Sequence, residues 1–419
     1  MTWRNWFFSL FCVSLLTTEF FFIDIAGGVA HIYQFYAVGV VLLLATSVLS
    51  LFRSKVFLAL LLFAMVNGVA AMLSDTPSAA FASLMANYAN LAIVIAVAVM
   101  LRSGRMTIKQ MYKMILVLTV INVVWGIIQV VAHKFGILLA LTDAQASQIS
   151  LGLGPGFRSE ADTLCKYLVL PFLLFLPNFL HDRRRWQLRV AYGIMAIGLL
   201  MDFTRTAVYG LAAALVFGYL WYIFKGQSSR VTTRFLAISA AALLGLTLIL
   251  NDSIPISEYV RFKVQNLFNQ QEIVSGGSSH YRLDSMNAVL ESTLESGKRE
   301  LIGNGWGQIH VYLQGEGRLT QVGGGDGIVV FGYSGLIGVA VYLLYTVLAF
   351  GAAARLAWRR DYTYHTLFSE GVMFALFGMF VTGQMAGYLI APEYHMLLGI
   401  CVYLSLIPSA LSVNIMRQR

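Results

Sequence analysis

Charged side chains are scarce in this chain. Only 12% of its 419 residues are Asp, Glu, Lys or Arg, whereas a soluble domain has about 25%. So few charges are not enough to cover the surface of a soluble protein of 46.3 kDa, but they suffice where most of the surface contacts lipid. Because 58% of the residues are hydrophobic, the composition predicts an integral membrane protein.

Cysteine is also nearly absent. Cys12, Cys165 and Cys401 lie in separate apolar stretches without metal-ligand spacing, which excludes a disulfide framework and a zinc site. The N-terminal apolar run up to Ile23 lacks a small-residue cleavage site and contains Glu19. We therefore expect a retained first transmembrane helix and not a cleaved signal peptide.

The apolar runs have the length of membrane-crossing helices, which need about 20 mostly apolar residues. The stretch from Trp186 to Phe224 is about twice that length and is interrupted by Asp202 and Arg205, so we predict two crossings there. An all-α integral membrane protein with about twelve transmembrane helices is therefore expected. The predicted spans are 6–23, 31–52, 55–74, 80–101, 111–133, 163–180, 186–203, 205–224, 233–250, 327–351, 367–386 and 393–413.

The distribution of Lys and Arg predicts the orientation of these spans. With the N-terminus inside, 19 of the 29 Lys and Arg residues fall in cytoplasmic segments, as the positive-inside rule requires. Both termini are then cytoplasmic, and the net charge of +9 needs no nucleic-acid partner. We expect one integrated domain: transmembrane helices 1–9 in residues 1–250, a large outer loop at 251–326, and helices 10–12 in 327–419.

Two outer segments are longer than simple turns. The first contains Gly-Leu-Gly-Pro-Gly-Phe-Arg at 152–158, a helix-breaking run that indicates either a surface loop or a re-entrant segment. The second is the 251–326 loop, in which apolar residues at helical spacing predict an amphipathic helix over 280–298. Glycines at 303, 305 and 307 permit a turn that returns this loop to the membrane.

Arg205 is the first candidate site residue, because a short apolar outer turn needs no arginine for topology. One interpretation is a snorkelling side chain paired with Asp202. The other is a cation that binds an anionic ligand at the membrane surface. Arg282, at the start of the loop helix, has the same two interpretations, with Asp284 as the local partner.

Asp326 is the candidate general base, because it lies among glycines at the threshold of span ten, where a carboxylate can accept a proton from a hydroxyl. The alternative is a helix N-cap. His310 is a second candidate base. Further polar candidates for substrate binding at the outer face are Arg158, Lys166, His280, Tyr281 and Asn304.

Several short motifs in this order resemble the bacterial O-antigen polymerase and O-antigen ligase superfamily. They are Thr-Arg-Thr-Ala at 204–207 on an outer hairpin, a large late loop with Arg282, Leu-Ile-Gly-Asn-Gly-Trp-Gly at 301–307, and Gly-Leu-Ile-Gly at 335–338. The resemblance spans most of the chain through its architecture. It implies an inner-membrane glycosyltransferase whose active site faces the periplasm and which uses an undecaprenyl-pyrophosphate-linked saccharide without a divalent metal or another cofactor.

The resemblance also implies roles for particular residues. Arg205 matches the arginine of the family's outer turn and Arg282 that of its large loop, and both would bind the donor pyrophosphate, which suits a forked guanidinium. The ligase branch has a histidine before its Gly-Leu-Ile-Gly helix, whereas that place falls near Gly324 here. This difference favours a polymerase that transfers the growing glycan onto a lipid-linked repeat unit. The resemblance then implies a chain-length-regulating co-polymerase as a partner.

Other functions remain open at the level of sequence. A ligase would transfer the glycan to lipid A-core or another acceptor. A transporter or flippase favours polar groups near the bilayer midplane and related halves, whereas the polar residues here gather at the outer face. A metal-dependent glycosyltransferase with acidic residues in its first outer loop and a scaffold role are the remaining alternatives.

Overall fold

The computed structural model describes residues 9–14, 22–25, 28–158, 161–181, 186–202, 204–226, 231–237, 240, 265, 278–306, 325–359, 363–389 and 391–407. The chain divides into two compact units, each built from three separate stretches. The first unit is Met1–Tyr33, Ile108–Gln270 and Ala357–Thr382, and the second is Gln34–Thr107, Gln271–Leu356 and Gly383–Arg419. Each unit therefore combines segments that the sequence-based division at 250 and 326 had separated.

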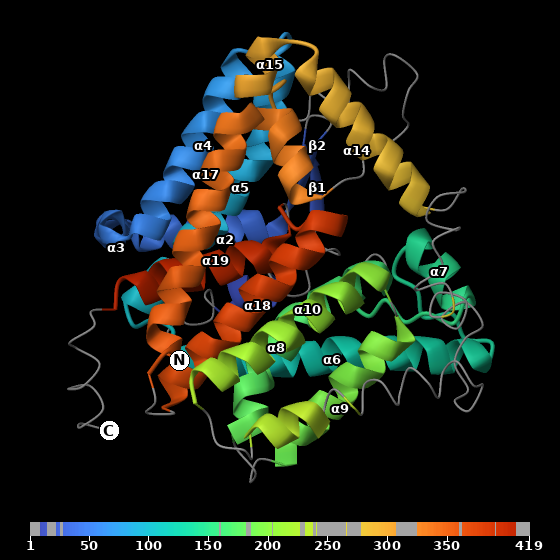
Figure 1. The fold of residues 1–419 in the computed structure, drawn as a ribbon. Coiled ribbons are helices and arrows are strands. Elements are labelled where there is room, and N and C mark those ends of the chain that lie inside the picture. The colour runs from blue at the N-terminus through green and yellow to red at the C-terminus, as the bar shows by residue number, and fades with distance from the viewer. Residues whose placement is uncertain are drawn as a thin grey trace. The chain divides into compact units, whose positions relative to one another are not determined.

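The first unit contains four long helices that pack against one another, and they are green in Figure 1. Pro171 and Pro177 lie inside one of them, α8, which is common in membrane helices because neighbouring elements satisfy the freed backbone groups. The four long helices are α6 (Ile108–Lys134), α8 (Ala161–His181), α9 (Trp186–Met201) and α10 (Arg205–Phe224), and the short helix α7 (Asp143–Ser150) lies between α6 and α8 in the sequence.

The second unit is also helical, and α4, α5 and α19 form its centre. Ser54 caps α4 by accepting the backbone N–H of Phe57 at 3.1 Å, and proline opens α5 and α19, where the missing N–H costs nothing. Figure 1 draws α4 and α5 in blue tones and α19 in red. The elements are α2 (Ile32–Leu43), α3 (Ala45–Val48), η1 (Leu49–Arg53), α4 (Lys55–Met72), α5 (Pro77–Arg102), α14 (Ser278–Leu294), α15 (Gly297–Ile302) and α19 (Pro392–Ser405).

Two further helices, α17 (Asp326–Ala357) and α18 (Tyr364–Ala386), contain residues of both units. Six helices in the described part of the chain are long and apolar enough to cross a membrane, or seven if the bent pair Ile32–Leu43 and Ala45–Arg53 is one span. The chain is therefore a predominantly helical, membrane-embedded protein. The total of twelve spans stays a prediction, since most of segment 233–250 lies outside the described residues.

The first two predicted spans are partly wrong. Residues 9–14 are helical, but Phe22–Ile25 forms strand β1, which pairs antiparallel with β2 (Gly28–His31), Phe22 opposite His31. The predicted span 31–52 is bent by 85° at Leu44, whose backbone has left the helical region. Ser50 donates to the carbonyl of Ser47 at 2.7 Å just after the bend, a local bond with which serine competes with regular helix.

Candidate functional site

The glycine loop at 152–158 is buried in the first unit and is held by three side chains, two from α6 and one from the end of α9. The amide of Gly154 donates to Asp202 Oδ1 at 2.8 Å, that of Gly156 to Gln129 Oε1 at 2.9 Å, and that of Phe157 to Asn122 Oδ1 at 2.7 Å. Irregular backbone at membrane depth is tolerated where protein groups satisfy it in this way. Of the two predicted alternatives, the structure therefore favours an inward-packed segment over a surface loop.

Glycine is required at two points of this contact. A Cβ atom on Gly154 would lie 2.4 Å from the carbonyl oxygen of Gly126 in α6, and one on Gly156 would lie 2.1 Å from Asn122 Oδ1. Gly156 also has a φ of +67°, which side-chain-bearing residues rarely adopt. The Gly-Pro-Gly run thus allows loop and helix backbones to touch.

The glycine loop ends at Arg158, whose side chain is buried and only 2% exposed. Its guanidinium carbon lies 4.6 Å from the ring centroid of Tyr167 on α8, a cation–π arrangement. Gln145 donates to the Arg158 carbonyl at 2.6 Å. Because Arg158 is buried, it supports the structure of the loop. Lys166, one turn into α8, is half-buried, so its side chain fits the predicted role in substrate binding better.

The hairpin between α9 and α10 carries Arg205 and is tied to the glycine loop. Asp202 follows the last residue of α9, is 1% exposed and provides the oxygen to which Gly154 donates. Its predicted pairing with Arg205 stays a prediction. Arg205 is the first residue of α10 and is half-buried. Because α8 begins just after the glycine loop, α10 begins at the hairpin that Asp202 ties to this loop, and the two helices pack together, Arg158, Lys166 and Arg205 belong to the same end of the first unit.

The start of α10 has chemistry that suits an anion. The side chain of Thr204, at the N-cap position, does not cap the helix and donates instead to the carbonyl of Asp202 at 3.2 Å. The hydroxyl of Thr206 is buried without a hydrogen-bond partner among the described residues. Helix N-termini attract negative charge through their amides and dipole, and here a guanidinium is added at the first position.

Asp326 lies in the second unit, at the first residue of α17, and is 2% exposed. Its Oδ1 accepts the backbone N–H groups of Tyr388 at 2.8 Å and Leu389 at 2.9 Å, and a Cβ on Gly383 would lie 2.3 Å from its Oδ2. The carboxylate thus binds the loop between α18 and α19, whereas the N-cap alternative had paired it with the amides of α17 itself. This geometry favours a structural clamp over a general base.

The other candidates of the large loop lie on or near α14 and α15. His280, Tyr281 and Arg282 belong to α14, but their side chains, like the whole of His310, lie outside the described residues. Asn304 is half-buried, and its amide nitrogen donates to Gly332 O at 3.1 Å and Thr293 Oγ1 at 3.3 Å. Its contacts are therefore within the protein.

Arg205 and Arg282 belong to different units. That both arginines bind the same pyrophosphate stays a prediction. Gly303 and Gly305 do form a turn, with φ of +82° and +88°, while the return of the loop to the membrane stays a prediction and Gly307 lies outside the described residues.

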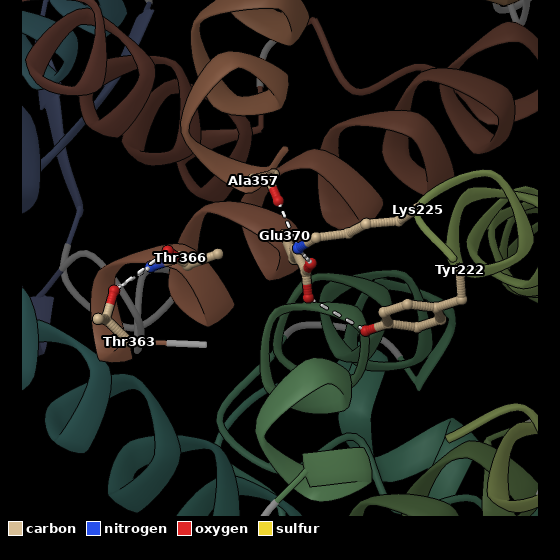
Figure 2. A network of polar contacts seen from close by, with 6 residues as sticks. All are labelled: Tyr222, Lys225, Ala357, Thr363, Thr366 and Glu370. Atoms are coloured by element: carbon tan, nitrogen blue, oxygen red, sulfur yellow. Dashed lines mark hydrogen bonds and ion pairs between the residues drawn. The ribbon is translucent and has the colours of Figure 1, made fainter. Parts of the chain in front are cut away.

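A buried ion pair in the first unit was not predicted from the sequence. Lys225 is one of the 19 Lys and Arg residues that the predicted topology places in cytoplasmic segments, yet it is 1% exposed and forms an ion pair with Glu370 of α18. Its ammonium also donates to the Ala357 carbonyl at 2.6 Å, and Tyr222 donates to Glu370 at 3.2 Å. Figure 2 shows the lysine reaching between the carboxylate and the end of α17. The lone carboxylate in the apolar run 367–386 was the available signal.

This pair gives a stability prediction. Replacing Glu370 by Gln leaves the Lys225 ammonium buried without its counter-charge, and we expect a loss of about 3 kcal/mol of stability. Thermal unfolding in detergent, followed by loss of the monodisperse peak, measures this. Lys225→Met with Glu370→Leu removes both charges and should recover most of the loss. Equal stability of Glu370→Gln and the parent would contradict the importance of the pair.

No protein-family model matches this chain, and no curated protein matches it.

Proposed function

We propose that this protein is a membrane polysaccharide polymerase that transfers a glycan from undecaprenyl pyrophosphate onto a lipid-linked repeat unit at the periplasmic face. The observation that carries the proposal is the position of Arg205 at the start of α10, on a hairpin that Asp202 ties to the glycine loop. A guanidinium beside helix amides suits a pyrophosphate leaving group, which needs electrostatic stabilisation as its bond to the sugar breaks.

The chemistry required of the protein is modest. The donor already carries a good leaving group, so the site must neutralise developing charge on the pyrophosphate and accept one proton from the acceptor hydroxyl. Arg205 serves the first task, and Arg282 is proposed to share it. Asp326 and His310 are the candidates for the second, and the burial of Asp326 gives His310 more weight.

Two acceptors distinguish the polymerase from the ligase. Purified protein in proteoliposomes is incubated with a lipid-linked repeat unit alone, or with that unit and lipid A-core. A polymerase gives a ladder of lipid-linked products with the repeat unit alone, whereas a ligase gives product only when lipid A-core is present. Absence of transfer in both mixtures, from folded protein, contradicts the proposal.

The orientation of the protein gives a separate prediction. Reporter fusions after Arg185 and Arg230 should be cytoplasmic, and fusions near Asn269 periplasmic, because of the Lys and Arg asymmetry of the loops. Paired alkaline phosphatase and green fluorescent protein fusions measure this. A cytoplasmic signal from the 251–326 loop would contradict both the inner-membrane topology with cytoplasmic termini and the periplasmic site.

A further inference from the structure

The membrane-spanning helix α17 is broken at Gly335, and the large loop fits into the break. Gly335 has φ of +61° and ψ of −162°, far from helical values, so the nine residues from Asp326 to Ser334 form a separate outer half-helix. A break of this kind exposes backbone carbonyls that need other partners. Those partners come from the segment after α15.

Backbone meets backbone at this joint. The amide of Asn304 donates to Gly332 O at 2.9 Å, and that of Gly305 donates to Tyr333 O at 3.0 Å. A Cβ on Gly303 would lie 2.4 Å from the amide of Ser334, and a Cβ on Gly335 would lie 2.3 Å from the carbonyl carbon of Leu301. Because glycine is required on both sides, the two glycine motifs of the sequence are two halves of one contact.

One side chain in the joint connects three elements. The side-chain nitrogen of Asn304, Nδ2, carries two N–H groups. It donates to Gly332 O on the outer half of α17 and to Thr293 Oγ1 on α14. The half-helix is also held at its other end, where Asp326 accepts the amides of Tyr388 and Leu389. Its orientation is therefore fixed at both ends, and Asn304 transmits that orientation to α14.

We propose that Asn304 is a positioning residue, which sets the angle of α14, the helix that carries Arg282, against the outer half of α17. The proposal rests on the proposed function for its chemical consequence. Arg282 is eleven residues from Thr293, about 16 Å along an α-helix, so a rotation of about 10° at Thr293 moves Arg282 by about 3 Å. A misplacement of about 1 Å at a reacting group can reduce the rate on the order of 10²-fold.

The angle is measured directly, without any assay of activity. Spin labels on Asp284→Cys, exposed on α14 nine residues from Thr293, and Ile337→Cys, 47% exposed on α17, report the distance between the two helices by pulsed electron resonance. The native cysteines Cys12, Cys165 and Cys401 are buried, which favours labelling at the introduced sites. The parent should give a narrow distribution, and Asn304→Ala should at least double its width.

One further variant isolates the side-chain N–H donors of Asn304, and a second variant is a matched control. Asn304→Asp keeps the size of the side chain and the backbone amide but removes the NH₂ group, so it should broaden the distribution as Asn304→Ala does. Asn287→Ala removes an exposed asparagine of α14 and should leave the distribution unchanged. A narrow distribution in both Asn304 variants would overturn the proposal, whether or not the protein is a glycosyltransferase.

A double-mutant cycle separates positioning from general loss of structure. Asn304→Ala should lower kcat/KM on the order of 10²-fold, and adding it to Arg282→Ala should cause little further loss, because the misplaced group is already absent. Full additivity of the two losses would overturn the positioning role even if the distance distribution broadens. If the parent shows no transfer at all, the proposed function fails, while the distance measurement still decides on the joint.

Discussion

Arg205→Lys should reduce glycan transfer on the order of 10²–10³-fold although the charge is kept, the range expected when a transition-state donor is removed. An ammonium cannot offer the bidentate fork of a guanidinium to a phosphate. The residue lies at the first position of α10 and is half-buried, so the backbone has no need of arginine there. Transfer from a purified lipid-linked donor, at matched protein concentration, measures the loss.

Arg189→Lys is the matched control for this experiment. Arg189 lies on α9 and is exposed, on the predicted cytoplasmic side, so the same chemical change should leave transfer within about twofold, as expected of a surface substitution. Arg282→Ala should behave like Arg205→Lys. Full polymer synthesis by stably expressed Arg205→Lys and Arg282→Ala would refute the pyrophosphate assignment.

Asp326→Ala should be the most damaging substitution for the second unit. It leaves the buried amides of Tyr388 and Leu389 without their acceptor, and each orphaned group costs about 1–3 kcal/mol. The combined loss is on the order of 4 kcal/mol. Asp326→Asn retains an oxygen that accepts both N–H groups, so this variant should fold and keep most of its turnover. Thermal stability and turnover are measured on the same preparations.

The same pair of variants also tests the general-base interpretation. If the carboxylate accepts a proton from the acceptor hydroxyl, Asp326→Asn should fold normally but lose turnover on the order of 10²–10⁴-fold. That result would contradict the clamp as the sole role of Asp326 and restore it as the base. Near-normal turnover in Asp326→Asn, with instability in Asp326→Ala, would instead move attention to His310.

Helix positions followed from the sequence because the length of an apolar run is a local property. The predicted span 205–224 coincides with α10, Arg205–Phe224, and the break before it was visible as Asp202 and Arg205 in an apolar stretch. The hairpin of β1 and β2 was missed, although Gly27-Gly28 between two apolar runs is a turn signal. A four-residue strand is much shorter than the run of about 20 apolar residues that indicates a membrane-crossing helix.

Long-range polar contacts could not be predicted from the sequence. Lys225 and Glu370 are 145 residues apart, and they meet only because of the way the helices pack. Asp326 was identified as a special residue through its glycine neighbours, but its partners at 388 and 389 follow only from the fold. Asn304 was assigned to the substrate for the same reason, since an amide that closes a joint and one that binds a sugar look alike in sequence.

Binding of the lipid product tests the central claim most directly, that Arg205 at the start of α10, together with Arg282 on α14, binds a pyrophosphate. Affinities of the purified protein for undecaprenyl pyrophosphate and undecaprenyl monophosphate are compared by microscale thermophoresis, in the parent and in Arg205→Lys. The account predicts that the parent prefers the pyrophosphate by about tenfold or more, a difference of about 1.4 kcal/mol, and that Arg205→Lys loses this preference. Equal affinities in the parent, or a preference unchanged in Arg205→Lys, would contradict it.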